Sequence, residues 1–349
     1  MTAVYASGTN TFVVSHDATQ NMVVDYARNI EDFPVNQYAQ IRKVDKVQGY
    51  WLSMTVEEAG RILNSNLADF EWPDGTVDPE ANDGTEAFEF LAFLAKRYRF
   101  GFNLGYLASG QAGWDIIAQH SSIKARQAMT ARTQKVVTAM TTSGSYDASH
   151  TSAVSSITGV SGKWDVSTTA RQDIKRSLDH AAETIYKDTL GAVTKKDLNL
   201  VLSPGCLRKI SVAQEIVDLL KGSPSAYGWI RGALAGEKVD YEVPKELYGY
   251  RLVVENTVKV TSRKGGTVAR SFVLGDTTPA LISRVGALEA KIPSQAPTFS
   301  SLTLFMQEEM TVETRDDPDN RRTKGRVVEC FDVKLTAPAS SFLFTAAVA

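Results

Sequence analysis

The chain has 349 residues, of which 43% are hydrophobic and 22% are charged; this composition is typical of a folded protein and excludes wholesale disorder. With 38 basic and 40 acidic residues the net charge is −2, which argues against a strongly basic nucleic-acid binder. Two cysteines, Cys206 and Cys330, exclude a disulfide framework and a four-cysteine zinc site. No apolar run approaches the ~20 residues that a membrane span needs, so we expect no membrane partner.

The first third of the chain contains two segments that are predicted to reach away from a core. Residues 1–35 lack a regular apolar period and are predicted to form an arm that becomes ordered on a partner surface. Residues 36–56 alternate like a strand. Between Glu57 and Glu89 there are ten acidic residues and one basic residue, so this stretch is predicted to be an acidic, solvent-reaching loop.

Residues 114–142 are predicted to form one long helix, because neither glycine nor proline interrupts them and apolar side chains recur at helical spacing. After Asp115 the charged residues of this helix are four cations, Lys124, Arg126, Arg132 and Lys135. Two interpretations remain open for them: a solvated helix face, or a stripe that binds phosphate or the acidic loop of another copy. Residues 143–162 are rich in Ser, Thr and Gly, which predicts a linker or exposed loop.

From Trp164 onward the pattern is typical of an α/β unit followed by long strands. An apolar helical face from Ile174 to Ile185 predicts a helix that ends at Gly191, and Leu198–Leu202 is predicted to be a buried strand. Ser203 and Pro204 are a typical cap and first turn for one further helix that ends at Gly222. Further strands are predicted at 250–254, 270–274 and 280–285, with a hairpin turn at 265–266, and as a long antiparallel pair within 300–345 whose charged turn spans 315–322.

The search for a catalytic or metal site is negative. The four histidines have no metal-ligand spacing, and the glycine-containing run 159–163 fits neither a nucleophile elbow nor a phosphate loop. Asp78, Glu80, Asn82 and Glu89 occupy four positions of a calcium loop, but Asp83 stands where the loop needs glycine. We therefore predict no catalytic residue, no cofactor and no metal, and a structural protein rather than an enzyme.

The order of elements, with the run Leu198–Pro204 followed by Leu207-Arg208 and Ile216-Val217, resembles the major capsid proteins of tailed bacteriophages, which share the Johnson fold. Val273–Asp276 with Ala280–Ile282 is similar to the later strand pair of that family, and Cys330–Lys334 to its returning terminal strand. The resemblance covers about residues 160–345, and the first half of the chain matches in order and character.

This resemblance implies an α+β protein with five parts. They are an N-terminal arm at 1–35, an extended loop and the start of a peripheral domain at 36–105, a spine helix and linker at 106–162, an axial domain at 163–290, and the long β strands of the peripheral domain at 291–349.

The function implied is a major capsid protein that assembles as hexamers and pentamers into an icosahedral shell around double-stranded DNA. It implies a place in the virion after assembly in the host cytoplasm, with a portal protein as partner and, where the assembly uses them, scaffolding or decoration proteins. Candidate contacts with DNA or neighbouring subunits are Lys124, Arg126, Arg132 and Lys135; candidate acidic contacts between subunits are Asp69, Glu71, Asp74, Asp78, Glu80 and Asp83. The alternatives are an encapsulin-like nanocompartment shell and, from another class, an α/β enzyme with a site near Ser203–Cys206.

Overall fold

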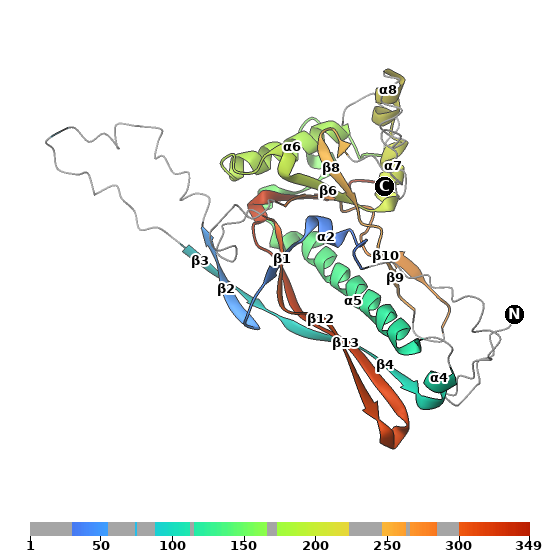
Figure 1. The fold of residues 1–349 in the computed structure, drawn as a ribbon. Helices are drawn as coiled ribbons and strands as arrows, with labels where there is room; N and C mark the ends of the chain where they lie inside the picture. The colour runs from blue at the N-terminus through green and yellow to red at the C-terminus, as the bar shows by residue number, and fades with distance from the viewer. Residues whose placement is uncertain are drawn as a thin grey trace.

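The computed structural model describes residues 30–54, 74, 88–111, 115–165, 173–222, 246–262, 266–284 and 300–349. Two parts are stacked on each other in Figure 1: one is built on a long helix and long strands, the other carries shorter helices, and a narrow ribbon of strands projects to one side. Within the described residues, no helix has the length and apolar character required to cross a membrane.

The peripheral part consists of helix α5 laid across a four-stranded sheet. Helix α5 spans Ile116–Thr141, close to the predicted limits, and the Asp115 side chain caps it by accepting a 2.9 Å hydrogen bond from the Ala118 N–H. The sheet runs in the order β1 (Gln40–Lys43), β12 (Leu302–Asp317), β13 (Arg322–Leu335) and β4 (Lys96–Gly105). Strands β12 and β13 form the predicted long antiparallel pair, joined by a turn at Pro318–Asn320.

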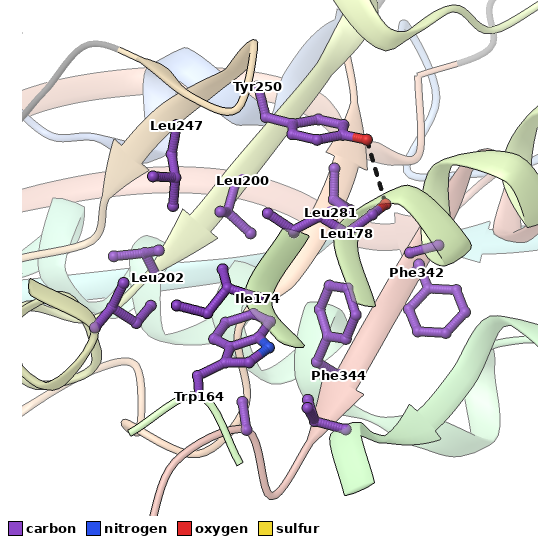
Figure 2. Packing of buried hydrophobic residues seen from close by; sticks show 14 of the residues in the cluster. Trp164, Ile174, Leu178, Leu200, Leu202, Leu247, Tyr250, Leu281, Phe342 and Phe344 are labelled. Carbon is purple, nitrogen blue, oxygen red and sulfur yellow. Dashed lines mark hydrogen bonds between the residues drawn. The ribbon is translucent and has the colours of Figure 1, made fainter. Parts of the chain in front are cut away.

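The axial part is a six-stranded mixed sheet with helices on one face. Its order is β5 (Thr151–Ala153), β14 (Ser341–Thr345), β11 (Ala280–Ser283), β6 (Leu198–Leu202), β8 (Tyr250–Val254) and β7 (Glu246–Leu247). Helices α6 (Asp173–Asp188), α7 (Pro204–Ser211) and α8 (Gln214–Gly222) cover one face. Figure 2 shows this core, in which Trp164 and Phe344 meet edge to face and the Tyr250 hydroxyl donates to the Leu178 carbonyl at 3.3 Å.

The other face of the axial sheet is buried against the peripheral part. Val201, Val253 and Ile282 point to this face and share one cluster with Met129 and Val136 of α5. Successive side chains of β6 point alternately into the two apolar cores. For this reason β6 is apolar at four of its five positions and buried at all five. The two parts are therefore held together by a continuous core rather than by a linker.

The remaining elements lie around these two parts. The ribbon pairs β2 (Gln48–Met54) with β3 (Phe88–Leu94), and a second ribbon pairs β9 (Val258–Val260) with β10 (Arg270–Phe272). Short helices are α2 (Val35–Tyr38) and α4 (Tyr106–Gln111), and 3-10 turns occur at Ser143–Ser145, Ala148–His150, Val154–Ser156, Lys195–Asp197 and Pro338–Ser340.

Three sequence predictions differ from the structure. Residues 143–162, expected as a linker or exposed loop, contain strand β5 of the axial sheet, and Val154 and Ile157 are buried in the axial core. The helix expected from Ser203 to Gly222 is broken into α7 and α8 at Val212, and the break turns α8 so that Glu215 accepts hydrogen bonds from the first N–H groups of α6, at Ile174 and Lys175. The last residues of the expected arm also contribute to the core, because Phe33 and Val35 are buried beside α5 and β12. Residues 1–29 lie outside the described part of the chain.

Candidate functional surfaces

Arg132, one of the four cations named as candidate contacts with DNA or neighbouring subunits, is buried inside the subunit. Its Nη2 lies 2.5 Å and its Nε 3.2 Å from Oε2 of Glu329, on the strand β13 that α5 crosses. Burial raises the pKa of the Glu329 carboxyl, and the Arg132 charge opposes that shift. Arg132 therefore holds a buried carboxylate of its own chain and is not presented to an outside phosphate.

Lys135, one turn farther along α5, also points at β13 and β4. Its ammonium group donates to the Tyr98 hydroxyl, lies 5.0 Å from the centre of the Tyr98 ring, and is 3.8 Å from Oδ1 of Asp332. A cation over an aromatic ring and beside a carboxylate is well compensated in place. Arg132 and Lys135 therefore both hold helix α5 on its sheet.

Lys124 and Arg126 lie in the N-terminal half of α5, and both are half-buried. The Lys124 ammonium donates to the Gln127 side chain at 2.9 Å, one turn along the same helix. Since successive helical residues are rotated by about 100°, Arg126 lies on a different side of the helix from Lys124. The structure therefore does not bring all four cations onto one open surface.

Of the six acidic residues predicted to contact neighbours, Asp74 is described and is exposed in a turn. Asp69, Glu71, Asp78, Glu80 and Asp83 lie outside the described residues. The calcium-loop pattern falls there as well, except for Glu89 on β3. Among the residues that the structure describes, no group of three or more His, Cys, Asp or Glu side chains is arranged to hold a metal ion.

The β2–β3 ribbon, from which the acidic stretch departs, has apolar side chains on both faces. On its inner face Phe93 stacks on Phe305 of β12 with ring centres 4.3 Å apart, and Trp51 lies 5.6 Å from the same ring. On its outer face Tyr50 and Phe90 are 65% and 69% exposed. Sequence reasoning read the alternation of β2 but did not identify this face, because alternation alone does not show which side is covered.

The site expected for the enzyme alternative, Ser203–Cys206, is packed inside the axial core. The Ser203 hydroxyl caps α7 by accepting from the Cys206 N–H at 3.0 Å, and it lies 2.5 Å from Oδ1 of Asp276. Burial, assisted by the Asp276 carboxylate, raises the pKa of the Cys206 thiol to about 12. A nucleophilic cysteine needs a lowered pKa. Ser203 therefore serves as a helix cap and Cys206 as a packed core residue.

Comparison with known proteins gives matches in structure alone. No family model matches the sequence, and no curated protein sequence matches it. A crystal structure of a phage-related protein from Bordetella bronchiseptica aligns with a TM-score of 0.58 at 14% identity, over 91% of this chain and 93% of that chain. The capsid structure of the cyanophage P-SCSP1u aligns with a TM-score of 0.54 at 11% identity, over 98% and 96%.

The capsid protein of the native GTA particle aligns with a TM-score of 0.52 at 11% identity, over 95% of this chain and 94% of that chain. These alignments span both the peripheral and the axial parts. The chain therefore has the Johnson fold of phage capsid proteins, an α+β arrangement, as the sequence resemblance predicted. At these identities the likeness establishes the fold.

Proposed function

We propose that this chain is the major capsid protein of a tailed bacteriophage, a structural subunit that assembles with copies of itself into an icosahedral shell of hexamers and pentamers. The observation that supports this most strongly is the alignment with capsid structures of a cyanophage and of the GTA particle over more than nine-tenths of both chains. The five-part division predicted from the sequence, from the arm at 1–35 to the strands at 291–349, is kept as part of this proposal with one change: β5 and β14, which fall in the ranges expected for the linker and for the peripheral strands, belong to the axial sheet.

The exposed aromatic face of the β2–β3 ribbon supports an assembling subunit on physical grounds. Tyr50 and Phe90 expose apolar rings on a projecting element, which is costly in a monomer. A shell subunit covers such surface with the next copy. The acidic stretch between Glu57 and Glu89 is too long and too charged to form a core of its own, and a neighbouring subunit would provide a surface on which it can pack.

We further propose that the shell encloses double-stranded DNA, which it contacts without sequence preference. A chain with a net charge of −2 needs only local cations for this, and Lys124 and Arg126, both half-buried in the N-terminal half of α5, are the members of the predicted set that we propose for it. Portal protein, and scaffolding or decoration proteins where the assembly uses them, complete the proposed partners. The proposed location is the virion, after assembly in the host cytoplasm.

Light scattering on the purified, concentrated protein tests the assembly proposal. We expect one large, uniform species of megadalton mass that holds nuclease-protected DNA when it is formed in cells. A particle that holds a protein cargo and no DNA would favour the nanocompartment alternative. A monomer under all assembly conditions would contradict a shell function of either kind.

We also propose that the subunit has no catalytic activity of its own. The buried Cys206 thiol, with its pKa of about 12, and the helix-capping role of Ser203 support this. The variant Cys206→Ala should still assemble, whereas an enzyme that used this thiol would lose its activity.

A further inference from the structure

The β9–β10 ribbon carries an apolar face that is exposed among the residues that the structure describes. Lys259 on the inner face donates to Gln134 of α5 at 2.7 Å, which fixes the ribbon beside the spine helix. The register pairs Val258 with Phe272 and Val260 with Arg270, so these four side chains share the outer face. Val260 is 61% exposed, and the other three are exposed as well.

The outer face of the β2–β3 ribbon is the second uncovered apolar surface of the same shape. Its register pairs Tyr50 with Ala92 and places Phe90 and Leu94 on the same side, all four exposed. Both surfaces are two-stranded ribbons, which are marginally stable alone and gain stability by packing a face on another element. Large exposed apolar patches on soluble proteins mark interaction sites.

The two ribbons lie on opposite sides of the subunit. In Figure 1 the β2–β3 ribbon projects on the left and the β9–β10 ribbon lies on the right of helix α5. Surfaces on opposite sides cannot meet within one copy, but they can meet between successive copies in a head-to-tail row.

The two ribbons belong to stretches of sequence with opposite charge. Residues 256–275, which contain β9 and β10, carry four basic residues and no acidic residue. The stretch between Glu57 and Glu89, which connects β2 to β3, carries ten acidic residues and one basic residue. Opposite potentials of this size favour the encounter of one copy's β2–β3 side with another copy's β9–β10 side and oppose like-to-like pairing.

We propose that the outer face of the β2–β3 ribbon of one subunit packs on the outer face of the β9–β10 ribbon of the next. The proposal rests on the proposed function, which it deepens by naming both halves of one contact between subunits. The contact is heterologous, so its repetition builds rings or rows rather than isolated pairs. Phe90 and Tyr50 supply the aromatic area on one side, and Val258, Val260 and Phe272 receive it on the other.

Thiol cross-linking tests the contact, because the two native cysteines are buried in the folded chain and should not compete for the reagent. Phe90→Cys and Val260→Cys are introduced into one chain and treated with a short, flexible bismaleimide. We expect a ladder of dimers, trimers and higher species on a denaturing gel. The matched control carries Phe90→Cys with Val212→Cys, on the exposed junction of α7 and α8, and should give no ladder.

The outcomes separate this contact from the shell proposal, because particle formation by the parent protein is scored independently by light scattering. A ladder, in particles or in concentrated unassembled protein, supports the contact. Particles without a ladder, or with dimers alone, overturn it and leave the shell function standing. If the parent forms no particles, the same cross-linking of concentrated protein decides the contact, and absence of a ladder overturns it.

A charge placed in the contact gives a second, independent measurement. Val260→Glu puts a carboxylate on an exposed position, so the subunit should fold normally and lose most of its particle yield. Val212→Glu, at a similarly exposed position away from both ribbons, should keep its yield. Equal yields from the two variants would contradict the contact.

Discussion

Arg132 and Glu329 form a buried ion pair that joins the spine helix α5 to strand β13 across 197 residues of sequence. The Arg132 Nη2 and Glu329 Oε2 atoms are 2.5 Å apart, and neither side chain has more than a tenth of its surface exposed. Among the described residues, the other carboxylate oxygen, Oε1, has no hydrogen-bond partner. The pair therefore positions the helix, but it is incompletely satisfied.

Removal of either Arg132 or Glu329 alone should lower the free energy of unfolding far more than removal of both. Arg132→Met leaves the Glu329 carboxylate buried without its cation, and we expect the free energy of unfolding to fall by about 3–5 kcal/mol. The double variant with Glu329→Leu should recover most of this loss, because an apolar pair of similar volume carries no desolvation cost. Urea unfolding of the unassembled subunit measures the free energy of unfolding of Arg132→Met, of Glu329→Leu and of the double variant. Losses that simply add would show that the two residues do not act as a pair.

Gly325 on β13 is required by the close approach of the Phe102 ring from β4. A β-carbon at Gly325 would lie closer to three Phe102 ring atoms than van der Waals contact allows, so the ring must move. We expect Gly325→Ala to lower stability by about 1–3 kcal/mol. Gly105→Ala, on β4, is the matched control, because a β-carbon there meets no described atom within 4 Å. Thermal unfolding compares them, and equal midpoints would refute the packing argument.

The two thiols should be inert in the native protein at neutral and mildly alkaline pH. Cys206 and Cys330 are buried, and burial raises the pKa of both thiols, that of Cys206 to about 12. Reaction requires the thiolate. A colorimetric thiol reagent at pH 8 should therefore label neither residue in the folded chain and both in denaturant. Rapid labelling of Cys206 in the folded chain would contradict its place in the axial core.

The turn of the β12–β13 hairpin should weaken in acid. Hydrogen bonds from Lys324, Arg322 and Asn320 hold the pKa of the Asp317 carboxyl well below its ordinary value. A lowered folded pKa means that the carboxylate contributes stability above its ordinary pKa of ~4 and loses that contribution as the pH falls through this value and below. Asp317→Asn should thus lower the unfolding midpoint at pH 7, and its difference from the parent should shrink toward pH 3.

Asp319→Asn, on the same turn, is the control for this experiment and should follow the parent at each pH. If the difference between parent and Asp317→Asn stayed constant from pH 7 to pH 3, the carboxylate charge would not be the cause.

Local sequence signals predicted the elements whose limits are set locally. The uninterrupted run after Asp115 predicted α5 within two residues of its observed ends, and the apolar run 198–202 predicted β6 at its observed limits. The charged turn predicted at 315–322 contains the observed turn between β12 and β13. In each case the residues that decide the structure are neighbours in sequence.

Features that depend on distant residues could not be predicted in the same way. The partners of Arg132 and Lys135, Glu329 and Asp332, are about 200 residues away, so spacing along α5 could not show that these cations are used internally. The break at Val212 carries no glycine or proline, and its consequence is the contact of Glu215 with α6. The open faces of the two ribbons depend on what the rest of the subunit covers.

Electron microscopy of the purified, concentrated protein tests the central claim most directly. The capsid proposal predicts closed, uniform icosahedral particles, with hexamers and pentamers of this chain visible in class averages. A field of dispersed single subunits, unchanged by concentration, salt or crowding agent, would contradict it.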